Sequence, residues 1–291
     1  MSNILITGSN GFIGSNILKN THLDNKIILI LRNKDRKNIG YYKNVKKIYY
    51  NDYDQLDKKL KKIKAEIIIH CATHYTKKHE AKDISKFVNS NILFGNILLN
   101  NLNNMRVKKF INFSSVWEDY NATKDNNVNL YSAYKKAFAL LLSYYKQTTP
   151  KTFFYEIMLS ETFGLNDKRK KLISVLKSNY KKNKITKINS SNLFINLLNV
   201  DDIVKAIKLI IKKNIKPEKY VLKNNTPYKI SDIVNLFNKK NIKKIKVKWL
   251  SKKMITEKIF KYKVLKGWKP QQSKIEDIFH IIKGWYKYED Y

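Results

Sequence analysis

The chain has 291 residues, a formal net charge of +36 and a single cysteine, Cys71. This composition excludes an internal disulfide and a cysteine-built metal site, and no apolar run approaches the roughly 20 residues of a transmembrane helix, so we expect a cytoplasmic protein with no membrane contact. The basic residues are spread along nearly every segment without a nucleic-acid recognition motif, which argues against a nucleic-acid partner and instead favours a polyanionic small substrate.

The first predicted element is a strand at Ile4–Ile6, followed directly by TGSNGFIG at residues 7–14. This segment spaces Gly8, Gly11 and Gly14 three residues apart. Such a turn from a buried strand into a helix presents backbone N–H groups and a helix N-terminus to a pyrophosphate. The first glycine permits the tight turn, the second lets phosphate approach, and the third lets helix and strand pack closely. The segment therefore predicts a dinucleotide-binding turn.

Apolar strands then alternate with helical patterns through the first half of the chain, which predicts an α/β fold with a Rossmann-type, doubly wound parallel sheet. The predicted strands are Ile27–Leu31, Ile48–Tyr50, Ile67–His70, Phe110–Phe113 and Phe153–Leu159. The predicted helices are Phe12–Asn20, Gln55–Ile63, Asp83–Leu102 and Leu130–Tyr145.

The pattern becomes less regular after about Asp167, which predicts a smaller, interwoven C-terminal lobe that binds substrate. We place the dinucleotide-binding domain at residues 1–165 and this lobe at 166–291, with about 194–213 returning to the core. The predicted elements are helix Lys170–Lys182, strand Phe194–Val200, helix Asp201–Lys213 capped by its paired aspartates, helix Ile230–Asn238 and helix Lys274–Tyr288.

A basic residue follows the second predicted strand, where an NAD site would place Asp or Glu against the ribose hydroxyls. This position is Arg32, with Lys34 and Arg36 close behind. A guanidinium suits the additional phosphate of NADP, because it offers several donors in a planar fork. We therefore predict NADP, with NAD as the alternative.

Tyr131 and Lys135 lie four residues apart at the start of a predicted helix and so share one face. An ammonium near a phenol lowers the pKa of the phenol and makes it a usable acid or base. Ser114 and Ser115 end the preceding strand, where a hydroxyl can hold a reacting oxygen. Tyr131 and Lys135, with a hydroxyl from Ser114 or Ser115, are therefore the predicted catalytic residues.

Together, TGSNGFIG, the IIIHCA segment at Ile67–Ala72, the two serines at Ser114 and the YSAYK segment at Tyr131–Lys135 resemble the extended short-chain dehydrogenase/reductases that act on nucleotide sugars. This is the NAD(P)-dependent epimerase, dehydratase and reductase family. The likeness continues through FG at Phe163, VDD at Val200 and GWKP at Gly267. Within the family, FINFSSVWEDY, VNLYSAYKKAF and ETFGLNDKRKKL resemble the branch of CDP-abequose synthase-like 4-ketoreductases.

The resemblance implies NADPH-dependent reduction of the 4-keto group of a deoxy nucleotide sugar, CDP-linked, for a surface polysaccharide such as lipopolysaccharide or capsule. It makes Tyr131 the general acid, Lys135 the residue that tunes Tyr131 and binds the nicotinamide ribose, and Ser115 the group that polarises the carbonyl. The implied cofactor residues are Gly8, Ser9, Asn10, Gly11, Phe12, Ile13, Gly14, Arg32, Asp52, Ala72, Tyr131 and Lys135. The implied substrate residues are Thr73, Ser115, Trp117, Glu161, Arg169 and Lys171. The resemblance also implies a homodimer, formed through the helices near Phe87–Leu102 and Leu130–Tyr145.

Two departures from the family bear on the reaction. The 4,6-dehydratases carry an Asp-Glu pair directly after the catalytic hydroxyl, whereas Ser115 is followed by Val116 and Trp117. Glu118 and Asp119 come later and would need an unusual loop to replace that pair. The Arg-Asp that the family carries before VDD is also missing, so Arg169 or Lys171 is expected to meet the diphosphate.

Two alternatives stay open at this point. A 4-epimerase would use the same Tyr and Lys but retain a tightly bound NAD. A protein of another class would keep the fold as a non-catalytic NADP sensor or RNA-binding protein. We expect no metal: His70 ends a buried strand as a structural histidine, and His74 and His79 with Glu80 lack the geometry of a metal site and are expected in the loop over the cofactor.

Overall fold

The computed structural model describes residues 1–38, 40–76 and 78–284, without the side chains of residues 36–38. Its contacts divide the chain into two units. The first unit comprises Met1–Met158, Ile207–Val221 and Ile259–Lys266. The second comprises Leu159–Ala206, Leu222–Lys258 and Gly267–Tyr291. The assignment of the cofactor to residues 1–165 and of substrate to 166–291 stays a prediction.

A seven-stranded sheet forms the centre of the first unit, in the order β11-β6-β5-β4-β1-β2-β3. Its strands are β1 (Asn3–Thr7), β2 (Lys26–Arg32), β3 (Val45–Tyr50), β4 (Ile67–His70), β5 (Lys109–Ser115), β6 (Phe153–Leu159) and β11 (Lys219–Leu222). The pairs β1–β2, β2–β3, β1–β4 and β4–β5 are parallel. Because the order proceeds outward from β1 in both directions, the predicted doubly wound sheet is confirmed. The reversal lies between β1 and β4, where such folds bind ligands.

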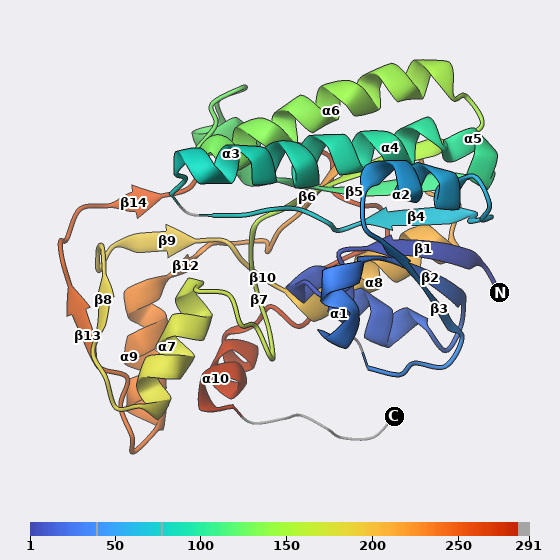
Figure 1. Cartoon of the computed structure of the whole chain (residues 1–291). Helices are drawn as coiled ribbons and strands as arrows, with labels where there is room; N and C mark the ends of the chain where they lie inside the picture. Colours follow the sequence, from blue (N-terminus) through green and yellow to red (C-terminus); the bar gives the residue numbers. More distant parts are fainter. Residues whose placement is uncertain (39, 77, 285–291) are drawn as a thin grey trace. The chain divides into compact units, whose positions relative to one another are not determined.

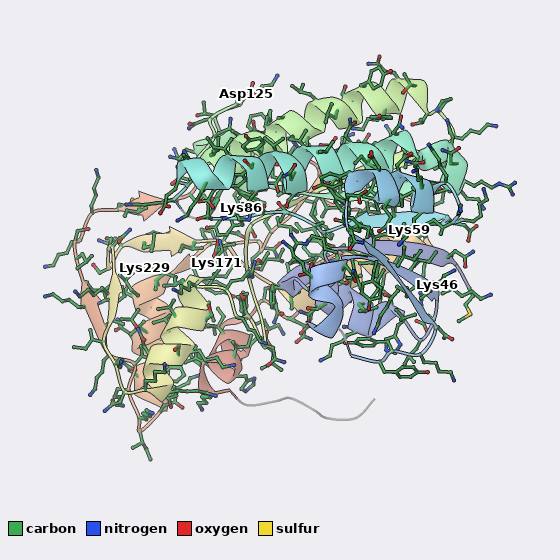
Figure 2. The ribbon with its side chains drawn as sticks, viewed as in Figure 1. Lys46, Lys59, Lys86, Asp125, Lys171 and Lys229 are labelled. Atoms are coloured by element: carbon green, nitrogen blue, oxygen red, sulfur yellow. The ribbon has the colours of Figure 1, made fainter. Side chains whose placement is uncertain are left out.

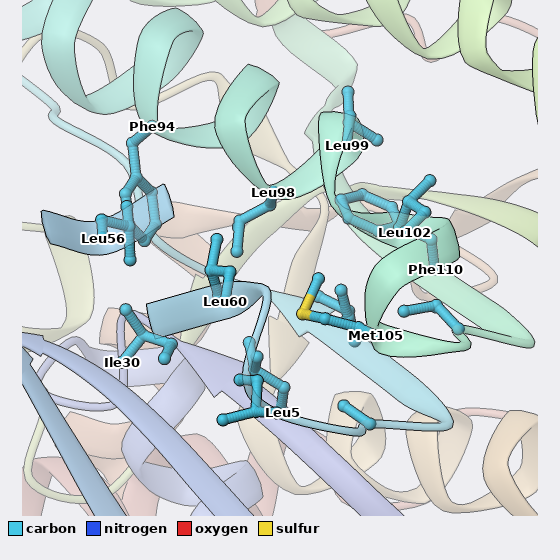
Figure 3. Close-up of a cluster of buried hydrophobic side chains, with 14 of the residues drawn as sticks. Leu5, Ile30, Leu56, Leu60, Phe94, Leu98, Leu99, Leu102, Met105 and Phe110 are labelled. Atoms are coloured by element: carbon cyan, nitrogen blue, oxygen red, sulfur yellow. The ribbon is translucent and has the colours of Figure 1, made fainter. Parts of the chain in front are cut away.

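Helices cover the two faces of this sheet, with α1 (Phe12–Thr21) on one face and α2 (Tyr53–Leu60), α4 (Phe94–Asn100) and α6 (Leu130–Thr148) on the other (Figure 1). The apolar side chains between the sheet and α2 and α4 form the core of the unit, among them Leu5, Leu60 and Leu98 (Figure 3). Parallel strands that are covered on both faces need runs of apolar residues, because the side chains on both faces are buried.

The single helix predicted at Asp83–Leu102 is instead a succession of shorter segments. These are α3 (Ala81–Phe87), the π-helical η2 (Val88–Leu93), α4 and α5 (Leu102–Met105). Glu80 and Asp83 form a capping box that starts the succession before the predicted residue. Apolar periodicity locates the buried face of a helix, but it does not distinguish a π turn from an α turn.

The second unit consists of small sheets around a separate apolar core. Its helices are α7 (Leu172–Lys181), α8 (Val200–Lys212, which continues into the first unit), α9 (Ile230–Lys240) and α10 (Ile275–Lys283). Its strands are β7 (Glu161–Phe163), β8 (Thr186–Ile188), β9 (Leu193–Ile195), β10 (Leu197–Asn199), β12 (Tyr228–Lys229), β13 (Val247–Trp249) and β14 (Ile255–Thr256). Phe163, Leu176, Phe237 and Ile278 are buried in this core.

The predicted strand Phe194–Val200 is wrong as one strand, because the chain changes sheets at Asn196. β9 pairs with β12 and β14, whereas β10 pairs with β7. The buried Asn196 side chain donates to the carbonyl of Asn224 at 2.8 Å and accepts from its N–H at 2.8 Å. A side chain that bonds to backbone in place of a neighbouring strand ends the regular ladder here.

Two helix ends also differ from the prediction. Asn199, rather than the paired aspartates, accepts from the N–H of Asp201 at the start of α8. The carboxylate of Asp202 instead accepts hydrogen bonds from the segment at Gln271–Ser273. The predicted helix Lys274–Tyr288 ends at Lys283, because Gly284 adopts a left-handed φ of +78° as its C-cap. Residues 285–288 of that prediction lie outside the described residues.

The basic side chains are distributed over separate elements rather than gathered on one. Lys46 of β3, Lys59 of α2, Lys86 of α3 and Lys229 of β12 illustrate this distribution (Figure 2). In the described part of the chain, no helix has both the length and the apolar character needed to cross a membrane.

Candidate active site

The glycine turn that follows β1 packs closely against the chain at the end of β4. Gly8 has φ +66°, and a Cβ at this position would lie 2.6 Å from the backbone nitrogen of Ala72. A Cβ on Gly14 would collide with the carbonyl oxygen of Gly8. Thr7 adds a polar link, since its Oγ1 accepts from the Ala72 N–H at 3.2 Å and lies 2.9 Å from Nδ1 of His70. Both glycines and Ala72 therefore meet where the sheet order reverses.

The start of α1 offers unsatisfied polar groups beside these glycines. Gly11 is the N-cap of α1 and supplies no side-chain cap, so the first N–H groups of the helix are not taken by a capping side chain. The buried hydroxyl of Ser9 has no hydrogen-bond partner among the described residues. Asn10 and Gly11 are exposed, while Phe12 and Ile13 are half-buried. An unpartnered hydroxyl and a glycine cradle at a helix N-terminus fit a bound phosphate group.

Two further predicted cofactor residues already have protein partners. The guanidinium of Arg32, at the end of β2, donates through Nε to the carboxylate of Asp35 at 2.8 Å. Asp35 lies in the 3₁₀ segment η1 (Asn33–Asn38). Asp52 is the N-cap of α2 and accepts from the N–H of Gln55 at 2.7 Å. The side chain of Arg36 lies outside the described residues.

Ser115 ends β5 and caps the next segment, η3 (Val116–Ala122). Its Oγ accepts from the N–H of Trp117 at 3.3 Å, and its own N–H donates to the Glu118 carboxylate at 3.0 Å. This is a capping box, in which serine and glutamate satisfy each other's backbone groups. Because Oγ serves here as an acceptor, its proton is left to donate to another oxygen.

Lys135 is buried against the end of the same strand. Its ammonium donates to the carbonyl of Phe113 at 2.9 Å and lies 6.0 Å from the ring centroid of Tyr131. Burial lowers the pKa of Lys135 to about 8, while Glu118 and Cys71 act in the opposite direction. The hydrogen bond to β5 therefore holds the N-terminal part of α6, with Tyr131 and Lys135, beside the strand that carries Ser115.

An aromatic side chain lies against Tyr131 and connects it to a second one. Tyr75, in the loop after β4, meets the Tyr131 ring edge to face at 5.1 Å and lies 6.3 Å from the Trp117 ring. Trp117 also packs against the cluster of Val116, Met158 and Val221. Thr73 is exposed near the start of this loop. An amphipathic aromatic wall next to a tyrosine suits contact with a sugar or a nicotinamide ring.

The remaining predicted substrate residues lie in the second unit and form two ion pairs. Lys171 donates to Glu161 at 3.1 Å. Arg169 donates from Nε and Nη2 to Asp167, both at 2.8 Å, and from Nη2 to Thr162 at 2.9 Å. Their role in binding substrate stays a prediction.

The histidines show no arrangement for a metal. Burial among Phe94, Phe110 and Phe138 lowers the pKa of His70 to about 3, so the ring is neutral. His74 packs edge to face on Phe87. No group of three or more His, Cys, Asp or Glu able to hold a metal occurs among the described residues.

Two residues next to the centre were not predicted as part of it, namely Tyr75 and Glu118. The sequence carries a signal for Glu118, because Ser115-Val-Trp-Glu118 has the S-x-x-E spacing of a capping box. That spacing predicts a glutamate turned back onto the serine rather than outward. Tyr75 has no comparable signal, since its place depends on the path of the loop after β4.

Comparison with known proteins identifies the family. The model of the NAD dependent epimerase/dehydratase family matches residues 4–222. A dTDP-D-glucose 4,6-dehydratase of Dictyostelium discoideum is 29% identical over 249 residues, covering 72% of this chain but 55% of the relative. A CDP-abequose synthase of Salmonella muenchen is 24% identical over 217 residues, covering 75% of this chain and 72% of the relative.

A solved structure shares the fold over nearly the whole chain. The UDP-glucose 4-epimerase of Thermus thermophilus, in complex with NAD, matches with a TM-score of 0.78 at 16% identity, covering 97% of this chain and 98% of the epimerase. By name, these similar proteins act on nucleotide sugars. Because the family model matches well over half of its residues, the chain belongs to the NAD dependent epimerase/dehydratase family.

Proposed function

We propose that the protein is an NADPH-dependent reductase that acts on the 4-keto group of a deoxy nucleotide sugar, with a CDP-linked sugar as the first candidate. The observation that carries this proposal is the centre at the end of β5, where the buried Lys135 bonds to Phe113 beside Tyr131 and Ser115. The 24% identity to a CDP-abequose synthase supports the choice of substrate class. A surface polysaccharide is the proposed destination of the product, and the cytoplasm the proposed location.

The chain's own residues supply the proton and hold the carbonyl. Ser115 donates its hydroxyl proton to the 4-keto oxygen, because its Oγ accepts from the N–H of Trp117. Tyr131 delivers a proton to the same oxygen as it gains negative charge. The ammonium of Lys135 stabilises the tyrosinate that remains.

The glycine turn fits a dinucleotide cofactor, because Gly8 and Gly14 leave no room for a Cβ and the Ser9 hydroxyl lacks a partner in the described part of the chain. Gly8, Gly11 and the first turn of α1 would hold the pyrophosphate, and Lys135 the nicotinamide ribose. When bound, NADPH supplies the hydride. Arg32 would contact the additional phosphate of NADP after exchanging its bond to Asp35.

The position of the acidic residues argues against dehydration of the sugar. The carboxylate of Glu118 accepts from the N–H of Ser115 and from the hydroxyl of Ser114, and Asp119 is paired with Lys136. Both are completely buried. Neither carboxylate is therefore disposed as the acid and base that elimination requires after the catalytic hydroxyl.

A 4-epimerase with tightly bound NAD is the second candidate, and one specific observation favours it. Arg32 is paired with Asp35, so an acidic group lies in the loop where NAD enzymes of this fold bind the ribose hydroxyls. The likeness in fold to the Thermus epimerase, whose structure contains NAD, is consistent with this candidate.

Two measurements on the purified protein separate these candidates. We expect NADPH to be oxidised in proportion to added CDP-4-keto-6-deoxyglucose, with dTDP-4-keto-6-deoxyglucose as the comparison for the base. Denaturation should release little nucleotide, because a consumed reductant must exchange at every turnover. Stoichiometric release of NAD, together with interconversion of UDP-sugar epimers, would instead establish the epimerase.

We also propose a homodimer formed by α3, η2, α4 and α6. Ile84 is exposed on α3, Val88 and Leu93 are exposed on η2, and Leu140 and Tyr144 are exposed on α6. The spacing of four residues places Ile84 with Val88, and Leu140 with Tyr144, on common helix faces. An apolar stripe of this kind on two neighbouring helices suits a self-complementary contact.

A further inference from the structure

We propose that Glu118 is a positioning residue of the reductase centre. It holds the backbone of Ser115 at the end of β5, the strand end to which the buried ammonium of Lys135 is also bonded, and its charge is coupled to that ammonium. This proposal rests on the proposed function for its catalytic meaning. Its physical content, the coupling of Glu118 to Lys135, is measurable without any substrate.

The contacts of Glu118 show how it acts on the serine. Its Oε1 accepts from the N–H of Ser115 at 3.0 Å and from the hydroxyl of Ser114. Two donors on one oxygen fix the chain direction at the end of β5 and so the place of the Ser115 hydroxyl. A glutamate that is 0% exposed and used in this way is part of the centre rather than of the surface.

The second carboxylate oxygen of Glu118, Oε2, has different surroundings from the first. Oε2 is buried and has no hydrogen-bond partner among the described residues. The ammonium of Lys219, on β11, lies 3.6 Å from it, beyond hydrogen-bond length. Burying a carboxylate oxygen without a hydrogen-bond donor costs free energy, and the nearby ammonium of Lys219 offsets part of that cost.

Lys135 needs such a partner because it is buried. Burial lowers its pKa to about 8, and Glu118 is the larger of the two groups that raise it again, ahead of the Cys71 thiol. The other groups near the ammonium are Tyr131 on the same helix and the neutral ring of His70 on β4. Glu118 is thus the carboxylate that favours the charged form of the lysine.

The next residue, Asp119, faces a different set of groups and offers a matched control. Its carboxylate accepts from Lys136 at 3.0 Å, from the N–H of Asp125 at 2.8 Å and from the hydroxyl of Tyr262. Burial opposes its ionisation, but these three donors hold the pKa of Asp119 below its usual range. Both carboxylates are buried in η3, yet Asp119 is not among the groups that shift the pKa of Lys135.

The test is the titration midpoint of Lys135 in the full-length protein, followed by NMR of ¹³Cε-labelled lysine and assigned with Lys135→Arg. Glu118→Gln keeps an acceptor for Ser115 but removes the charge, so we expect the midpoint to fall by about 1 to 2 pH units. Lys219→Gln removes the competing cation and should raise it. Asp119→Asn should leave it within about 0.3 units, well below the effect of a direct charge partner.

A midpoint that does not move in Glu118→Gln, or that moves equally in Asp119→Asn, would overturn the proposal. If Glu118→Gln does not fold, the upward shift in Lys219→Gln decides the matter alone. Failure of the proposed function is recognised separately, because it appears as absence of NADPH oxidation in the wild type. Where turnover is measurable, Glu118→Gln should lose kcat above pH 7 and retain it at pH 6, whereas Glu118→Ala should lose it throughout.

Discussion

The hydroxyls and the ammonium of the centre act through short, directed contacts, so their roles are best tested residue by residue. Lys135 is held by one hydrogen bond to the carbonyl of Phe113, and Ser115 by its capping box with Glu118. Tyr131, by contrast, is bordered by the ring of Tyr75. Removing a hydroxyl from Tyr131 therefore changes the chemistry more than the packing.

Tyr131→Phe should reduce kcat by about 10²–10⁴-fold, the usual contribution of a general acid, with little change in melting temperature. Tyr134→Phe is the control, because Tyr134 lies one helical turn from Tyr131. Its ring stacks on Phe87, and a phenylalanine keeps that contact. NADPH oxidation with a 4-keto nucleotide sugar measures both variants. Equal activity in Tyr131→Phe and wild type would remove Tyr131 from the mechanism.

The lowered pKa of Lys135 predicts a limit at alkaline pH. The ammonium loses its proton as the pH rises through about 8, so NADPH affinity should fall above that pH. Fluorescence titration of NADPH from pH 6.5 to 9.5 measures this, with Lys135→Arg, which stays charged, as the comparison. A flat wild-type profile would contradict the assignment. The sign for stability is opposite: between about pH 8 and 10.5 the unfolded chain holds a proton that the folded chain has lost, so the free energy of unfolding should rise.

At the scale of elements, the turn between β1 and α1 is the part of the site that sequence predicts best. Gly8 and Gly14 are required by steric contacts within a few residues of each other and with Ala72, and such contacts leave a spacing in the sequence. The predicted ends of strand β4, Ile67 and His70, match the structure for a different reason, since its three isoleucines form a short apolar run.

Polar contacts, both distant and local, account for what the sequence does not reveal. Asn196 ends a strand by bonding to Asn224, 28 residues away, and Arg32 pairs with Asp35 only because η1 turns the chain back. Neither contact has a periodic signature. Gly284, by contrast, is a signal in the sequence, since a glycine after a helical run is a usual C-cap. The predicted extension of the helix to Tyr288 disagrees with this signal.

Gly14→Ala tests the glycine turn as an element. The added Cβ would meet the carbonyl of Gly8, so the start of α1 must move away from β1. We expect NADPH affinity to fall by at least about 10-fold, because the helix N-terminus then misses the pyrophosphate. Gly40→Ala is the matched control, since nothing lies within 4 Å of its added Cβ. Unchanged binding in Gly14→Ala would place the cofactor elsewhere.

At the scale of the whole molecule, the exposed apolar side chains of α6 are a feature that the isolated chain does not explain. Leu140 is 72% exposed and Tyr144 59% exposed. A protein with a net charge of +36 resists association through charge repulsion, so a dimer needs a specific apolar contact to overcome it.

Leu140→Glu should convert the proposed dimer to a monomer, measured by light scattering coupled to size-exclusion chromatography. It adds a charge on a helix face that would be buried twice in a two-fold contact. Leu250→Glu is the control, because Leu250 is also exposed, at 56%, but lies in the second unit. A monomeric wild type would remove the dimer, and a dimeric Leu140→Glu would remove α6 from its interface.

The composition of the first unit has a consequence for how the chain is made. The unit takes Ile207–Val221 and Ile259–Lys266 from far along the sequence, and the ammonium of Lys109 on β5 donates to the carbonyls of Ile210 and Lys213 at the end of α8. When the glycine turn, Tyr131 and Lys135 have emerged from the ribosome, the edge strand β11 has not yet been synthesised. The nascent protein therefore possesses every predicted catalytic residue long before it can complete its sheet, and its cofactor is expected to bind late in synthesis rather than to guide it.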